Sequence, residues 1–129
     1  MRYLAVFKGG KEGTPPSEHE MAEMGKLIGE MAQAGVLLAA EGCQPSAKGV
    51  RVRASNGKFT VIDGPFTESK ELIGGFCLFQ VTSKAEAIDW TKRFLEVGGD
   101  GECEVRELYD VPAFDPSSQP QHAPAAAKR

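Results

Sequence analysis

The same order of local patterns occurs twice in the sequence, and this order restricts the chain to few folds. Each copy has an apolar strand-like run, a Ser-x-x-Glu capping box that begins a helix, and a second strand-like run. The capping boxes are Ser17 with Glu20 and Ser83 with Glu86. The expected strands cover residues 2–8, 36–40, 75–81 and 103–109. This order predicts an α+β, ferredoxin-like β-α-β-β-α-β fold with a central antiparallel sheet and both helices on one face.

The inner faces of the two helices follow from apolar residues at helical spacing. In the first helix, which should end at Gly35, these are Met21, Met24, Leu27, Ile28, Met31 and Ala34. In the second they are Ala87, Ile88, Thr91, Phe94 and Leu95. Gly25 and Gly29 share a face of the first helix. Because each weakens a helix by up to ~1 kcal/mol relative to Ala, we expect a close neighbour there.

A hairpin is expected between the two β-α-β units. Residues 49–53 and 58–62 alternate in polarity around Asn56-Gly57, a strong two-residue turn pattern. With that turn, one face carries Val50, Val52, Ala54, Phe59, Val61 and Asp63. The face is otherwise apolar, so Asp63 is expected to point toward the core side, at its edge.

Length and composition limit the domain organisation and the partners. The 129 residues suit one domain, assigned to residues 1–111, and the Pro/Ala-rich tail at 112–129 is expected to be disordered. A net charge of −3 without a basic stripe argues against nucleic acid. No apolar run reaches the ~20 residues that span a membrane, and no signal peptide is evident, so a cytoplasmic location is expected. Apolar residues on both sheet faces predict a homodimer that covers the second face.

The three cysteines do not suggest a metal or disulfide site. Their number is odd and no CxxC occurs. Cys77 and Cys103 fall in strands, where a buried thiol acts as a small apolar side chain. Cys43, between Gly42 and Pro45, should be accessible.

The densest group of charged residues follows the hairpin. Asp63-Gly64-Pro65-Phe66 forms a sharp corner, and Glu68, Lys70 and Glu71 come next. One interpretation is structural: Asp63 accepts hydrogen bonds from the amides of its own turn, and Phe66 pins the loop to the core. The other is functional: a carboxylate beside apolar walls has a raised pKa and transfers protons.

The string DGPF-T-E-S-K-E-L, followed by G-G-F, resembles the DGPF group of the YCII-related (YciI-like) family. The resemblance implies a dimeric α+β barrel. Some members of the family are fused to, or encoded near, extracytoplasmic-type sigma factors. Related proteins are suspected enzymes with a His–Asp pair, and one branch takes part in the breakdown of chlorinated aromatics. Here His19 lies too early in the first helix to match that histidine, so the pair is not carried over.

Two functions remain open from the sequence. The first is a small cofactor-independent enzyme that acts on an organic acid or aromatic in a cleft at the DGPF loop. Its candidate residues are Asp63 as general acid/base, Glu68 or Glu71 as a second acid, Arg51 or Arg53 as anion anchors, and Lys70 and Phe66 as ligand contacts. No metal is expected, since no histidine accompanies these acids. The second is a non-catalytic dimeric ligand-binding or interaction module associated with transcriptional regulation by sigma factors.

Overall fold

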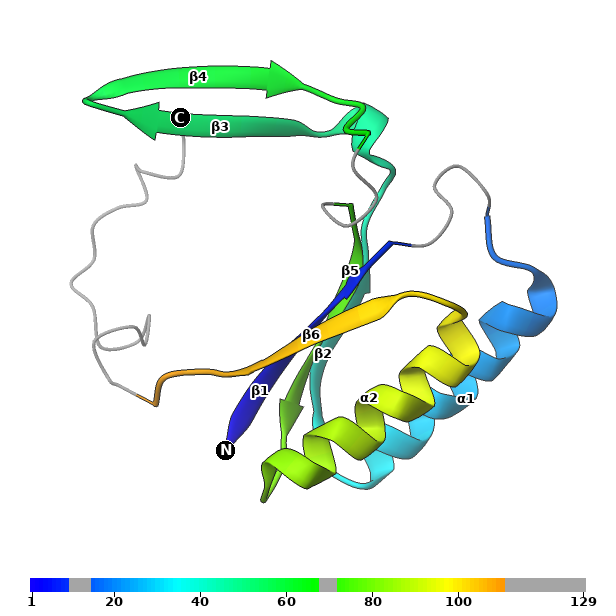
Figure 1. Ribbon diagram of the computed structural model, residues 1–129. Coiled ribbons are helices and arrows are strands. Elements are labelled where there is room, and N and C mark those ends of the chain that lie inside the picture. Colours follow the sequence, from blue (N-terminus) through cyan, green and yellow to red (C-terminus); the bar gives the residue numbers. More distant parts are fainter. Residues whose placement is uncertain (10–14, 68–71, 111–129) are drawn as a thin grey trace, which may run out of the picture.

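The computed structural model describes residues 1–9, 15–67 and 72–110 (Figure 1). The chain forms β1 (Arg2–Lys8), α1 (Glu18–Gln33), β2 (Leu37–Gly42), the short 3-10 helix η1 (Ser46–Lys48), β3 (Val50–Ser55), β4 (Lys58–Asp63), β5 (Ile73–Gln80), α2 (Lys84–Gly98) and β6 (Glu102–Glu107). The expected tail lies outside the described residues. Within them, no helix is long and apolar enough to cross a membrane.

Four strands form one antiparallel sheet in the order β2-β5-β1-β6. Both helices lie along one side of this sheet, and β3 with β4 forms a separate two-stranded hairpin that extends away from them (Figure 1). If the hairpin is counted as an insertion, the strand order is that of a ferredoxin-like fold. The predicted α+β architecture is therefore confirmed for the single chain.

The core fills the space between the sheet and the helices. Met31 of α1 and Phe79 of β5 are fully buried at its centre. The surrounding buried side chains are Tyr3, Ala5, Leu27, Val36, Cys77, Val81 and Ala87. Met21, expected in the core, is 60% exposed because it lies in the second turn of α1, beyond the side chains that cover the sheet.

The first capping box is confirmed and the second is only half formed. Ser17 Oγ accepts a bond from the Glu20 amide, and the Ser17 amide donates to Glu20 Oε1 at 2.8 Å. Ser83 Oγ likewise accepts from the Glu86 amide at 3.1 Å. The Glu86 carboxylate, however, accepts from the amide and hydroxyl of Thr82, one residue earlier, and these bonds lower its pKa. A neighbouring hydroxyl thus displaces the reciprocal bond.

Two glycines outside α1 are needed for packing, whereas those inside it are not. A Cβ at Gly74 or Gly101 would lie 2.7 or 2.6 Å from the ring of Phe7, which packs edge-on against Phe94. No atom lies within 4 Å of a Cβ at Gly25 or Gly29. The expected close approach to α1 at these two positions is therefore wrong.

The hairpin has the predicted register but not the predicted environment. Asn56 and Gly57 have positive φ values of 52° and 79°, as a type I′ turn requires, and Val50 pairs with Asp63. The shared apolar face is solvent-exposed: Val52 and Val61 are each 63% exposed and Phe59 is 76% exposed. The expectation that Asp63 points toward the core is therefore wrong, because the two helices already complete the core and the hairpin leaves the sheet.

The methionines of α1 provide a matched test of this core. We expect Met31→Ala to lower the free energy of unfolding by about 2–5 kcal/mol, because it leaves a cavity beside Phe79. Met21→Ala, the same change at an exposed position of the same helix, should stay within about 0.5 kcal/mol of the wild type. Urea denaturation at one fixed protein concentration measures both values. Equal midpoints for the two variants would contradict the assignment of the core.

Candidate functional site

The DGPF corner is fixed by hydrogen bonds to the connection between β2 and β3. The Gly64 amide donates to the carbonyl oxygen of Gly49 at 3.0 Å. The Phe66 amide donates to Ser46 Oγ at 3.1 Å, across twenty residues of sequence. The Gly64–Pro65 peptide bond between these amides is cis. The two ends of the inserted hairpin are therefore tied together where it joins the sheet.

Gly64 is required at this corner for a steric reason. A Cβ at position 64 would lie 1.8 Å from the carbonyl oxygen of Ser46. This oxygen belongs to the backbone, so it cannot move aside as the end of a flexible side chain could. The two backbones can approach this closely only where one residue lacks a side chain. The glycine of DGPF thus holds the corner against η1.

Phe66 and Arg51 pack on one another. The guanidinium carbon of Arg51 lies 3.9 Å from the centroid of the Phe66 ring, within the range of a cation–π contact. Phe66 is half-buried and is not among the residues of the main core. It therefore anchors the corner to β3. The structural interpretation of the sequence expected Phe66 to pin the loop to the core, and this expectation is wrong.

The carboxylate of Asp63 does not stabilise its own turn. An Asp at this position could accept bonds from the next few amides of the turn. The amides of Gly64 and Phe66 instead donate to Gly49 and Ser46, and Pro65 has no amide hydrogen. The Asp63 side chain is exposed and, within the described residues, has no hydrogen bond or ion pair. The structural interpretation of Asp63, in which its carboxylate accepts hydrogen bonds from the amides of its own turn, is therefore wrong.

The other predicted site residues are divided between two faces and an undescribed segment. Because side chains alternate along a strand, Arg51 and Arg53 lie on the hairpin face opposite to Asp63. Arg53 is exposed. Glu68, Lys70 and Glu71 lie outside the described residues. The hairpin therefore does not by itself bring the predicted acid and its predicted anion anchors to one surface.

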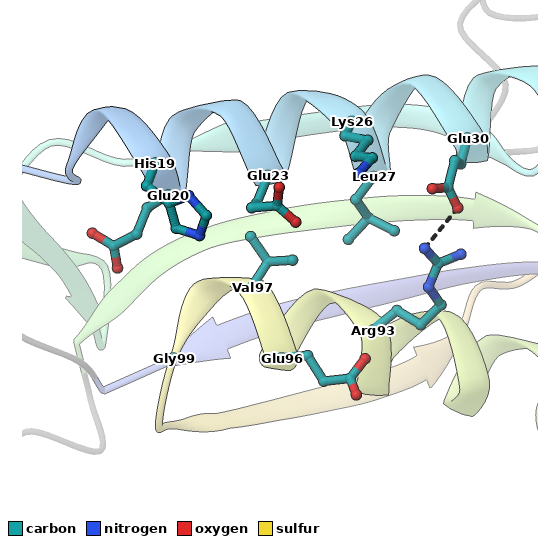
Figure 2. A pocket seen from close by; sticks show the side chains of 10 residues that line it. All are labelled: His19, Glu20, Glu23, Lys26, Leu27, Glu30, Arg93, Glu96, Val97 and Gly99. Atoms are coloured by element: carbon teal, nitrogen blue, oxygen red, sulfur yellow. Dashed lines mark ion pairs between the residues drawn. The ribbon is translucent and has the colours of Figure 1, made fainter.

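A groove that the sequence did not indicate runs between the outer sides of α1 and α2 (Figure 2). It has a volume of about 550 Å³, and Leu27 and Val97 face one another across it. Arg93 bonds Glu30 across the groove at 2.6 Å. The remaining lining residues are His19, Glu20, Glu23, Lys26, Glu96 and Gly99. His19, Glu23, Lys26 and Glu30 recur at intervals of three or four residues in α1, the pattern that could have identified this face.

The residues that line this groove belong to α1, to α2 and to the position after α2, and none of them belongs to the DGPF corner. Its charges have both signs, and most of its charged side chains are exposed. No group of three potential metal ligands occurs in the part of the chain that the structure describes. Charges of this kind, largely hydrated, provide little binding energy by themselves.

The thiols follow the expected division. Cys77 is buried, Cys103 is half-buried and Cys43 is exposed. Burial, with a smaller effect from the neighbouring Cys103, raises the pKa of Cys77 to about 11. Burial also raises the pKa of Cys103 to about 11. Neither sheet thiol is therefore a nucleophile near neutral pH, since the thiolate is the reactive form.

With this geometry established, the chain can be compared with known proteins. The family model of the YCII-related domain matches residues 1–112. The chain belongs to the YCII-related domain family. The predicted resemblance to the YCII-related family is thereby confirmed.

Two similar proteins are known, one found by sequence and one by structure. The chain is 32% identical over 92 residues to an uncharacterised protein of Rhizobium meliloti (strain 1021), which covers 70% of this chain and 74% of the relative. A solved structure of 5-chloro-2-hydroxyhydroquinone dehydrochlorinase from Burkholderia phenoliruptrix AC1100, in complex with 2,5-dihydroxybenzoquinone, is similar at 14% identity. That match covers 89% of this chain and 100% of the other, with a TM-score of 0.49.

The corner predicts opposite effects for one substitution at two glycines. Gly64→Ala should destabilise the protein by about 1–3 kcal/mol, because its Cβ would overlap the Ser46 carbonyl. Gly25→Ala, on an open helical surface, should stabilise it by up to ~1 kcal/mol. Urea unfolding gives the free energies, and hydrogen exchange of the β3 and β4 amides should accelerate only in Gly64→Ala. Wild-type stability and wild-type exchange in Gly64→Ala would contradict the close contact.

The buried thiols predict a loss of stability at alkaline pH. The unfolded thiol of Cys77 ionises near its ordinary pKa of 9.0, whereas the folded thiol keeps its proton until pH about 11. Between these values the unfolded state binds fewer protons, so the free energy of unfolding should fall as the pH rises. Cys77→Ala should show a shallower fall than the wild type, and the exposed-site control Cys43→Ala should show the wild-type slope. Identical slopes in all three proteins would contradict the raised pKa.

Proposed function

We propose that this YCII-family protein is a homodimeric, cofactor-independent enzyme that binds a small organic acid or aromatic at the DGPF corner, with Asp63 as the proton-transfer group. The observation that carries the proposal is that the amides of the turn do not donate hydrogen bonds to the Asp63 carboxylate. The amides within its reach donate to Gly49 and Ser46, and the carboxylate is left exposed at the end of β4. A structural role alone would not require an acid here.

The surroundings of Asp63 are suited to a small, partly apolar ligand. Asp63 continues the exposed apolar face of the hairpin and is paired directly with Val50. A ligand bound against these side chains would displace water from the carboxylate, which raises the pKa of the carboxyl group. A carboxylate whose pKa moves toward neutrality removes and returns protons more readily near neutral pH.

The rigid corner supports the same proposal. Proton transfer needs the acid within about 2.6–3.2 Å of the proton that it moves, so the carboxylate must be positioned in advance. The contact of Gly64 with Ser46 and the stacking of Phe66 on Arg51 fix the backbone next to Asp63. Glu68 or Glu71, five and eight residues further on, would supply the second acid, and Lys70 a cation for an anionic ligand.

The homodimer in this proposal forms through the sheet face that the helices leave open. Leu4, Val6, Phe76 and Leu78 alternate with the buried core residues of β1 and β5, so they lie on that face, and each is half-buried. An apolar surface of this kind on a small chain favours association with another protein, and a second copy provides a self-complementary surface.

Thermal-shift screening of a metabolite library tests the proposal. A ligand at a hundredfold excess over its Kd stabilises the folded protein by about 2.7 kcal/mol. We expect organic acids or aromatics among the hits, and Asp63→Asn should abolish turnover of the identified ligand while keeping the size of the side chain. The matched control is Asp89→Asn on the exposed side of α2, which should behave like the wild type.

The other outcomes identify the alternatives. If ligands bind to wild type and Asp63→Asn alike and are not turned over, the result would contradict the enzyme and support a non-catalytic ligand-binding module. No hit in the library, with normal stability of Asp63→Asn, would favour the interaction module and direct the search toward protein partners.

A further inference from the structure

One carboxylate of strand β6 is shared by two cations. Lys8 Nζ lies 2.7 Å from Glu104 Oε1, and Arg106 Nε lies 2.6 Å from Glu104 Oε2. The side chains of Lys8 and Glu104 are only 28% and 39% exposed, so this pair is less hydrated than an ordinary surface ion pair. Hydrogen bonds from Lys8 and Arg106 lower the pKa of the Glu104 carboxyl group, which therefore stays ionised near neutral pH. The three side chains together carry one positive charge that none of them neutralises.

These side chains lie on the sheet face that the helices leave open. Ala5 of β1 is buried in the core beneath the helices. Because side chains alternate along a strand, its neighbours Leu4 and Val6 point to the other face. Arg106 pairs with Leu4 and Glu104 pairs with Val6, and paired residues share a face. Since β6 is an outer strand of the sheet, the ions lie along one margin of the open face.

The two cations have donors that Glu104 does not use. The Arg106 guanidinium donates to Glu104 through Nε, and the Lys8 ammonium makes one bond to the same carboxylate. Within the described residues, neither side chain has another hydrogen bond or ion pair, and the Arg106 side chain is 77% exposed. A guanidinium that is fixed through Nε presents both Nη groups together. This pair of donors matches the two oxygens of a carboxylate.

The other charged residues of β1 and β6 leave an excess of positive charge on this margin. Arg2 lies two residues before Leu4, and its Nη2 donates to the carbonyl oxygen of Tyr109 at 3.0 Å. Glu102 is exposed and pairs with Lys8 across the two strands. Three cations therefore stand against two carboxylates on this side of β1 and β6, namely Arg2, Lys8 and Arg106 against Glu102 and Glu104. The local field favours a bound anion over a bound cation.

Apolar side chains lie directly beside these charges. Leu4 and Val6 are half-buried, and both helices are on the other side of the sheet (Figure 1). On the next strand, Leu78 pairs with Leu4 and Phe76 pairs with Val6. A ligand whose anionic group reaches Arg106 can therefore remove apolar surface from water by lying on these residues. A flat or branched apolar acid matches both features, whereas a small hydrated anion matches only the charge.

We propose that Arg106 and Lys8 form a binding site for a small apolar carboxylic acid at the β6 margin of the open sheet face. Arg106 binds the carboxylate through both Nη groups, and Lys8 adds a second positive charge. Leu4 and Val6 contact the apolar body of the ligand. All these groups belong to one chain, so the site requires neither Asp63 nor the proposed homodimer.

Amide chemical shifts recorded by NMR during titration with benzoate test the site. Benzoate combines a carboxylate with a flat apolar ring, benzamide keeps the ring without the charge, and acetate keeps the charge without the ring. We expect benzoate to shift the amides of β1 and β6 and to saturate. Benzamide and acetate should each bind at least about tenfold more weakly. Acetate that binds as tightly as benzoate would overturn the assignment to an apolar acid.

Substitutions of two arginines test the anchor. Arg106→Gln removes the charge and the paired donors, and we expect it to weaken benzoate binding by about tenfold or more. Arg106→Lys keeps the charge without the paired donors, so it should recover only part of the affinity. The matched control is Arg93→Gln, because Arg93 also pairs with a glutamate but lies on the helices, and it should bind benzoate like the wild type. Thermal unfolding verifies that all variants are folded.

Asp63→Asn separates this site from the DGPF corner. We expect it to bind benzoate like the wild type. Loss of binding in Asp63→Asn, with normal binding in Arg106→Gln, would place benzoate at the corner, overturn the β6 site and support the proposed function. Benzoate shifts that do not saturate, or that persist unchanged in Arg106→Gln, would overturn the β6 site and leave the proposed role of Asp63 unaffected.

Discussion

The close contact between Gly64 and the carbonyl of Ser46 is the constraint on which the rest of the DGPF region depends. Between β2 and β5 the chain leaves the sheet, forms a hairpin and returns. The outgoing and returning segments must meet at the base of the hairpin, and the missing Cβ of Gly64 allows this. The amides of Gly64 and Phe66 then bond the outgoing segment. The hairpin is thus inserted without disturbing the core of the ferredoxin-like fold.

The same constraint explains why the role of Asp63 differs from the simplest expectation for a tight turn. The amides nearest to it are bonded to Gly49 and Ser46, which precede Asp63 by 14 and 17 positions, so no short-range pattern could have predicted these partners. The sequence correctly identified the corner and its turn-forming residues. It did not indicate that the Asp63 carboxylate accepts no hydrogen bond from the amides of Gly64 and Phe66. Conversely, the predicted hairpin register already placed Arg51 and Asp63 on opposite faces of the hairpin. Their separation could therefore have been predicted from the sequence.

Local patterns predicted the helices and the hairpin register well, because caps and turns depend on neighbours within four residues. The Ser17–Glu20 box and the Asn56-Gly57 turn are examples. Alternation shows which side chains share a face of the hairpin, but not what that face contacts, and so the exposure of the apolar face of the hairpin was not predicted. The expectation for Gly25 and Gly29 was wrong for a related reason. A glycine weakens a helix whether or not another element packs against it, so its presence alone does not predict a close neighbour. The groove between α1 and α2 combines two helices far apart in sequence.

The open sheet face and the Asp63 carboxylate lie in one chain, and the proposed dimer would couple them energetically if its ligand contacts both subunits. If the ligand contacts both subunits, it binds the dimer more tightly than the monomer. By linkage, the ligand must then strengthen the dimer by the same factor by which dimer formation strengthens ligand binding. A composite site therefore makes apparent ligand affinity depend on protein concentration, whereas a site within one subunit does not. The same contact would have a chemical effect: a second copy packed beside Asp63 would exclude water from the group that transfers the proton.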